Sequence, residues 1–164
     1  MYENYIRTNK TAFLAELSRI SNLLGINPEW LMIVMYAESG VNEKAVNKTS
    51  GATGLIQFMP STAKGLGTTV QKLYAMTNVQ QLYYVYKYFS PYAGKITSVT
   101  DLYKIVFFPV MIGKPTSWVL QTSTLSAYTV ANANKIIDLN RDGKITVAEF
   151  ENYVMTYLKK KQTS

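Results

Sequence analysis

The sequence Ala37-Glu38-Ser39-Gly40 opens the stretch that decides the fold, and it leads through Asn47 into Gly51-Ala52-Thr53-Gly54-Leu55-Ile56-Gln57-Phe58-Met59-Pro60. Upstream, Asn27-Pro28-Glu29 is a helix start signal, so the acid lies near the end of a predicted helix that Gly40 allows to stop. The glycines that follow predict tight turns around the amide of Gln57. A carboxylic acid near an amide-bearing turn is a candidate for acid/base chemistry.

Composition narrows the class of protein. The chain has 164 residues, 48% hydrophobic and 16% charged, which predicts one domain, or one domain with a small appendage, and a sizeable core. It contains neither cysteine nor histidine. These absences exclude a disulfide framework, a thiol nucleophile, a Ser-His-Asp triad and a zinc site built on either residue.

The charge and the hydropathy of the chain indicate which kinds of partner it binds. The net charge of +7 is scattered apart from Lys159-Lys160-Lys161, and no nucleic-acid motif accompanies it, so we expect a solvated basic surface and no nucleic-acid partner. The longest apolar run, 106–112, is interrupted by Pro109, so we expect no membrane span. The first five residues lack the basic and apolar regions of a secretory signal. We expect a monomer.

Apolar residues recur at helical spacing along most of the chain, and no segment alternates convincingly with period two. The sequence therefore predicts an all-α fold. Signals for starts and ends predict helices at 13–24, 28–40, 78–89, 101–113, 124–132 and 147–158, and a short one from Pro60, with Asn78 and Asp101 as N-caps. We divide the chain into a main domain, 1–123, and a C-terminal extension, 124–164. We expect the extension to pack on the main domain.

The motifs carry a family resemblance. Glu38-Ser39, Gly54-Leu55-Ile56-Gln57 and Phe58-Met59-Pro60-Ser61-Thr62-Ala63 resemble the soluble lytic transglycosylases, relatives of goose-type lysozyme that cut bacterial peptidoglycan. The likeness is dense over 30–67. A weaker likeness to phage-associated and Bacteroidetes-type members continues through 101–103 and 108–109 to 113–115. The resemblance implies a lysozyme-like fold and peptidoglycan glycan strands as the partner.

The resemblance also implies roles for single residues. Glu38 would be the general acid/base, and Ser39 would support the backbone around it. Substrate contacts would come from Gln57, from Asn47 in the adjoining loop and from Met59 in the site wall. The family's third motif, Ala-Tyr-Asn, is not intact: Ala127-Tyr128-Thr129 keeps two of its letters, and Tyr103 is the rival for the tyrosine.

The acids favour one mechanism over another. Of the ten Asp and Glu residues, only Glu38 is a credible catalytic acid, whereas an ordinary glycosidase needs two carboxylates flanking the bond. One acid favours assistance by the N-acetyl group of the substrate and a 1,6-anhydro product, as the resemblance also implies. Two alternatives stay open: hydrolysis by a muramidase of the same fold, and a catalytically silent wall-binding or tail-structural module. Action on the cell wall, with delivery by a phage or in a virion, is the expected setting.

A second motif lies near the C-terminus. Residues 138–149 match the twelve-residue EF-hand loop, with Gly143 at position 6. The expected calcium ligands are Asp138, Asn140, Asp142, the carbonyl of Lys144, Thr146 and Glu149. Because only one such loop is visible, we interpret it as a structural Ca²⁺ clip and not as a sensor; catalysis would need no cofactor. A dockerin-like module, which would repeat the loop, is the rival interpretation.

Overall fold

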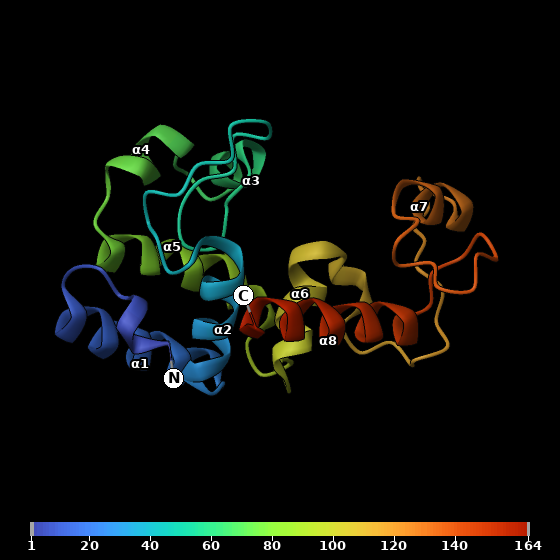
Figure 1. Ribbon diagram of the computed structural model, residues 1–164, viewed down its shortest axis with the longest axis horizontal. Coiled ribbons are helices and arrows are strands. Elements are labelled where there is room, and N and C mark those ends of the chain that lie inside the picture. The colour runs from blue at the N-terminus through green and yellow to red at the C-terminus, as the bar shows by residue number, and fades with distance from the viewer. Residues whose placement is uncertain (1, 164) are drawn as a thin grey trace. The chain divides into compact units, whose positions relative to one another are not determined.

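The computed structural model describes residues 2–163, and within them the regular structure is helical, without a strand (Figure 1). This confirms the all-α prediction. The α-helices are α1 (Lys10–Leu24), α2 (Pro28–Ser39), α3 (Pro60–Gly65), α4 (Val70–Ala75), α5 (Asn78–Phe89), α6 (Val99–Phe107), α7 (Ala127–Ala133) and α8 (Val147–Thr163). Short 3-10 helices lie at Glu3–Tyr5, Ser90–Tyr92 and Pro109–Met111. No helix among the described residues is long and apolar enough to cross a membrane.

The chain divides into two compact units, one up to Leu102 and one from Tyr103 onward. The domain boundary expected from sequence, after residue 123, falls inside the second unit and stays a prediction. The first unit contains the whole of the glycine-rich stretch, and the second contains the EF-hand-like loop.

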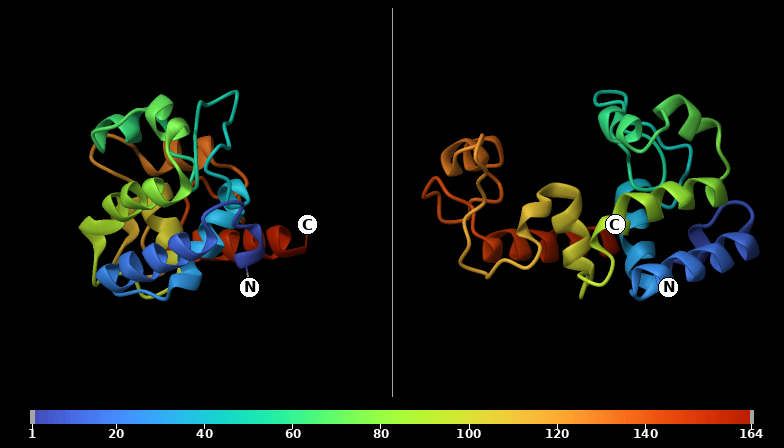
Figure 2. Two further views of the ribbon diagram at one scale, coloured as in Figure 1. Left: turned by 90° about the vertical axis from the view of Figure 1, so that its left-hand side faces the viewer. Right: turned by 180° about the vertical axis from the view of Figure 1, so that it is seen from behind.

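In the first unit, α1 packs along α5 and against α2. On the other side of α5 lie α3, α4 and the long loop 40–59 (Figures 1 and 2). The helices bury the apolar faces that their periodicity predicts, including Phe13, Ile20, Leu31, Leu82 and Phe89. This core fixes the end of α2 relative to α5, and both helices contribute to the candidate site.

The helix starts follow capping chemistry, with two corrections to the expected caps. The Asn27 side chain accepts a hydrogen bond from the Glu29 N–H (2.9 Å), and Pro28 occupies the first turn, as predicted. The cap of α5, however, is Thr77, which forms a capping box with Gln80. Asn78 is instead buried and donates its amide to the Thr8 carbonyl (2.7 Å), so the prediction of Asn78 as the cap is wrong.

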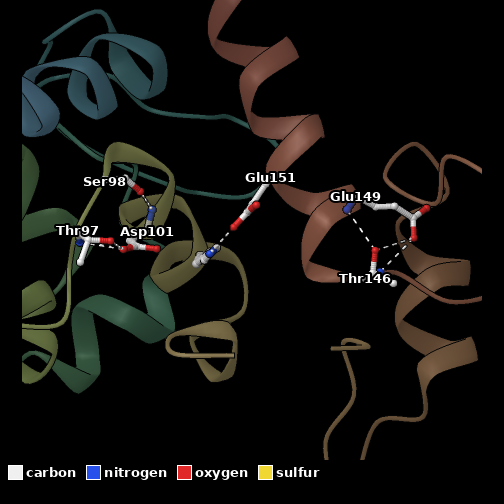
Figure 3. Close-up of polar contacts among 7 residues, drawn as sticks. Thr97, Ser98, Asp101, Thr146, Glu149 and Glu151 are labelled. Atoms are coloured by element: carbon white, nitrogen blue, oxygen red, sulfur yellow. Dashed lines mark hydrogen bonds and ion pairs between the residues drawn. The ribbon is translucent and has the colours of Figure 1, made fainter. Parts of the chain in front are cut away.

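The second correction concerns α6. The predicted cap, Asp101, lies within the first turn of the helix, and its carboxylate accepts hydrogen bonds from the backbone N–H and the hydroxyl of Thr97, both at 2.8 Å (Figure 3). The helix ends at Phe107 and not near residue 113. Pro109 explains this, because proline disfavours helical geometry in the residue before it.

In the second unit, the part of α6 from Tyr103 onward contacts α8. The Phe107 and Phe150 rings stack with centroids 5.0 Å apart, and Lys104 forms an ion pair with Glu151 at 2.8 Å (Figure 3). The EF-hand-like loop pairs with an earlier segment of the chain: Leu120 N–H donates to the Ile145 carbonyl (2.8 Å), and Val147 N–H donates to the Trp118 carbonyl (3.0 Å). An isolated antiparallel bridge joins Val119 and Thr146 at the same place.

Candidate functional site

Glu38 lies in the last turn of α2 and is half-buried. The chain leaves the helix immediately afterwards, through Gly40 at φ 65°. The Gly40 N–H bonds the Tyr36 carbonyl (2.9 Å) and the Val41 N–H bonds the Met35 carbonyl (3.1 Å), which closes the helix end. The carboxyl group is therefore carried on a fixed backbone at the edge of the first unit's core.

Ser39 joins this helix end to the glycine-rich turn. Its Oγ lies 2.8 Å from the Leu55 carbonyl and 3.0 Å from the Met35 carbonyl, and it accepts a hydrogen bond from the Asn42 N–H at 3.1 Å. The single hydroxyl proton can be given to one of the two carbonyls at a time. Ser39, the neighbour of Glu38, thus holds the turn against the helix; the supporting role that the resemblance implies for it stays a prediction.

Gln57 lies in that turn with a left-handed backbone, φ 57°. Its amide nitrogen donates to the carbonyls of Gly54 (3.0 Å) and Ala45 (3.2 Å). These two bonds use both amide hydrogens, which leaves the side-chain oxygen as the group that a sugar N–H or hydroxyl could meet. Its contact with substrate stays a prediction.

Asn47 and Met59 flank the turn. Asn47 is exposed, and its side-chain oxygen accepts hydrogen bonds from the N–H groups of Thr49 (2.9 Å) and Ser50 (3.1 Å), so it organises the tip of the loop. Met59 is exposed at the residue before α3. Both roles in substrate binding stay predictions, and both residues are accessible to a ligand.

Sequence reasoning missed two buried polar residues of this region. Gln81, on α5, is 0% exposed, and its side chain accepts a hydrogen bond from the Leu55 N–H (3.0 Å). The sequence signal that could have identified Gln81 is its position on the apolar face of the predicted helix 78–89, next to Leu82. Glu43 is 7% exposed, and its Oε2 has no hydrogen-bond partner among residues 2–163. Nothing in the sequence around Glu43 distinguishes it from a surface acid.

Aromatic side chains pack beside the Gly54–Gln57 turn. The Phe58 ring meets the Tyr88 ring of α5 edge to face, with centroids 6.5 Å apart. Burial raises the pKa of Tyr88 to about 12, with a smaller contribution from the charge of Tyr92. Tyr88 is therefore neutral at physiological pH and acts here as an apolar support.

Both tyrosines considered for the third motif belong to the second unit. Tyr103 is buried on α6, and its ring packs edge-on against Tyr157 at 6.1 Å. Tyr128 is 68% exposed and lines a pocket of about 540 Å³ together with Lys135 and Arg141. Which of the two contacts substrate stays open.

The EF-hand-like loop has the expected turn. Gly143, at position 6, has φ 80°. The two Asp138 oxygens accept hydrogen bonds from the N–H groups of Asp142 (3.3 Å) and Gly143 (3.0 Å). Asn140 accepts from the Asp142 N–H at 3.2 Å, and Asp142 accepts from the Lys144 N–H at 3.0 Å. The polar side chains at positions 1, 3 and 5 are thus ordered along one turn.

Glu149, at position 12, reaches back over the loop. Its carboxylate accepts hydrogen bonds from the N–H of Leu139 (2.8 Å) and from the N–H and hydroxyl of Thr146 (3.1 and 3.2 Å; Figure 3). Within residues 2–163, no three acids are gathered closely enough to hold a metal ion. The donor chemistry and the turn fit calcium, but the carboxylates bond backbone N–H groups that an ion would have to displace or share.

The site of the first unit is a helix-terminal acid, a serine clamp and an amide-bearing turn on a helical scaffold. Residues 19–90 match the family model of the transglycosylase SLT domain, a match that covers less than half of the 164-residue chain. Glu38, Ser39, Asn47, Gln57 and Met59 all lie within the matched segment. The match supports the family resemblance inferred from the motifs.

Proposed function

We propose that the protein is a peptidoglycan lytic transglycosylase in which Glu38 is the single general acid/base. The observation that carries this proposal is the Ser39 clamp. It fixes the half-buried Glu38 beside the Gly54–Gln57 turn through the Leu55 carbonyl at 2.8 Å, inside the segment that matches the transglycosylase SLT domain.

The proposed reaction needs one carboxyl group in two states. Glu38 first donates its proton to the oxygen of the β-1,4 bond between N-acetylmuramic acid and N-acetylglucosamine, while the substrate's N-acetyl oxygen bonds C1 as the leaving group departs. The Glu38 carboxylate then accepts the C6 hydroxyl proton, and that oxygen displaces the N-acetyl oxygen from C1. The product is a 1,6-anhydromuropeptide, and no water is consumed.

The placement of Glu43 favours this mechanism over one with two carboxylates. It is the acid closest to Glu38 along the chain, but the residue is only 7% exposed and its Oε2 is buried. A carboxylate that acts as nucleophile or activates water has to reach the sugar ring or the solvent. The muramidase alternative would therefore also depend on Glu38 alone, with water in place of the C6 hydroxyl group.

The test compares Glu38→Gln with Glu43→Gln on purified peptidoglycan sacculi. The amide of Glu38→Gln cannot donate a proton, so lysis should fall by about 10²–10⁴-fold or more, with the helical circular dichroism spectrum unchanged. Glu43→Gln should retain lysis within a few-fold. A folded Glu43→Gln variant as inactive as Glu38→Gln would contradict the single-acid mechanism.

Mass spectrometry of the released fragments separates the alternatives. Anhydro products are lighter than hydrolysis products by one water molecule and take up no label from heavy-oxygen water. Labelled reducing ends would identify a muramidase. Binding to sacculi without any release of fragments would identify the silent module.

We propose that the loop 138–149 holds a structural Ca²⁺ ion. The ligands would be the side-chain oxygens of Asp138, Asn140, Asp142, Thr146 and Glu149 and the carbonyl of Lys144. The ion would supply only charge neutralisation and loop closure, since proton transfer at Glu38 needs no metal. Action on the bacterial cell wall as a monomer, delivered by a phage or in a virion, completes the proposal.

A further inference from the structure

Gln81 is a fully buried amide that bonds three different segments of the first unit. Its oxygen accepts a hydrogen bond from the Leu55 N–H at 3.0 Å. Its nitrogen donates to the Glu43 carbonyl at 2.8 Å and to the Leu73 carbonyl at 2.7 Å. Both amide hydrogens are used, so the side chain joins the loop after α2, the glycine-rich turn and α4 to helix α5.

Gly54 is shaped to this amide. A Cβ atom at position 54 would lie 2.5 Å from the Gln81 Oε1, closer than non-bonded atoms approach, and 3.1 Å from its Cδ, which is a tight contact. The three hydrogen bonds prevent the amide from moving aside. Gly54 also has φ 87°, a conformation that other residues adopt only with strain. The glycine of the turn and the glutamine of the helix therefore fit as a pair.

The amide is linked to the proposed catalytic acid, Glu38, through Leu55 and Ser39. The Leu55 N–H bonds Gln81, and the Leu55 carbonyl lies 2.8 Å from the Ser39 hydroxyl, next to Glu38. Leu55 is thus held through both its N–H and its carbonyl group. The position of the turn relative to Glu38 depends on both bonds.

The same amide ties together the two walls of a groove. The groove measures about 470 Å³; its loop wall includes Val46 and Thr53, and its α4 wall includes Val70 and Tyr74. Gln81 bonds Leu55, two residues from Thr53, and Leu73, which precedes Tyr74. A change at Gln81 would alter the spacing of these walls without contacting anything bound between them.

We propose that Gln81 is a positioning residue for glycan binding: it sets the place of the Gly54–Gln57 turn and the width of the groove, and it does not touch the reacting atoms. This inference rests on the proposed function, because the bound polymer is taken to be peptidoglycan. It assigns affinity for the glycan to a side chain buried beneath the surface that binds it.

The experiment compares Gln81→Met with Gln80→Met. Methionine preserves the length and volume of Gln81 but removes its three hydrogen bonds. Gln80 is exposed, and its side chain accepts the Thr77 N–H in the capping box. Initial rates of fragment release from solubilised glycan chains should give a KM at least tenfold higher for Gln81→Met, with a smaller change in kcat. Gln80→Met should change neither by more than about twofold. An unchanged KM in a folded Gln81→Met variant would overturn the proposal.

Two further measurements keep this proposal separate from the proposed function. Binding of the same glycan chains is measured with Glu38→Gln as the background, so that it does not depend on turnover; Gln81→Met should weaken it at least tenfold, and equal affinity would refute the role of Gln81. Hydrogen exchange in the unmodified protein needs no variant to fold. The Leu55 amide should exchange far more slowly than the exposed loop amide of Lys48, and equal rates would show that the Gln81 bond does not hold the turn.

Discussion

Replacing Glu149 with glutamine should uncouple the stability of the protein from calcium. The carboxylate is the last ligand of the proposed site. Glutamine keeps its length and one accepting oxygen, which can take the bonds from Thr146. Its NH2 group cannot accept from the Leu139 N–H, but Leu139 is exposed and water can take that bond. The fold without metal should therefore change by only about 1 kcal/mol. What glutamine loses is the negative charge and the paired oxygens that Ca²⁺ requires at position 12.

The expected effect on the unmodified protein follows from linkage. Calcium at 100 times its dissociation constant adds about 2.7 kcal/mol to the free energy of unfolding. For a chain of this size, about 2–4 °C of melting temperature accompanies each kcal/mol, so chelation should lower the Tm by about 5–11 °C. Since the proposed proton transfer at Glu38 needs no metal, lysis at low temperature should largely survive the same treatment.

Thermal melting followed by circular dichroism, in calcium and in chelator, measures this directly. Glu151→Gln is the matched control, because Glu151 lies on the same helix two residues further on and pairs with Lys104 at 2.8 Å. It should lower the Tm equally in both solutions and keep the calcium response. A calcium response that persists in Glu149→Gln, or that is absent from the unmodified protein, would refute the proposed site.

Two further predictions concern the first unit. Folding raises the pKa of Tyr88 to about 12; between pH 10 and 12 the unfolded chain therefore releases this proton before the folded one, and stability falls as the pH rises. Tyr88→Phe should remove about 1–2 kcal/mol of that loss. Urea unfolding at pH 9 and pH 11, about one unit either side of the usual tyrosine pKa, measures the difference. An identical pH response in the variant and the unmodified protein would contradict this prediction. Gln57→Ala should weaken lysis without abolishing it, since it removes hydrogen bonds worth about 0.5–1.5 kcal/mol each and no proton donor. A loss as large as that of Glu38→Gln would give Gln57 a larger role than substrate binding.

Local signals predicted the helices well where the chemistry is local. The cap at Asn27, the exit at Gly40 and the start of α3 at Pro60 each depend on residues within one turn. Prediction failed where a distant partner competes: Asn78 gives up the cap to Thr77 because its amide bonds the Thr8 carbonyl, 70 residues away in sequence. A hydrogen bond to a residue so far away in the sequence produces no local sequence pattern.

The residues of the candidate site likewise fall into those that local sequence predicts and those that it does not. Glu38, Ser39 and Gln57 lie in a compact motif, so their type and spacing identify them. Gln81 and Glu43 belong to the same region only because the chain folds back, and a buried amide or acid has the same letter as an exposed one. The motif predicted candidate residues for the chemistry, but not the buried residues Gln81 and Glu43 beside them.

The pairing of 116–120 with the EF-hand-like loop bears on how the protein avoids unwanted association. An unpaired extended edge is a template for a second chain. Here the N–H groups of Leu120 and Val147 already bond the Ile145 and Trp118 carbonyls, at 2.8 and 3.0 Å. The loop is thus paired with a segment of its own chain, so these backbone groups are already bonded and do not present a free edge to another copy.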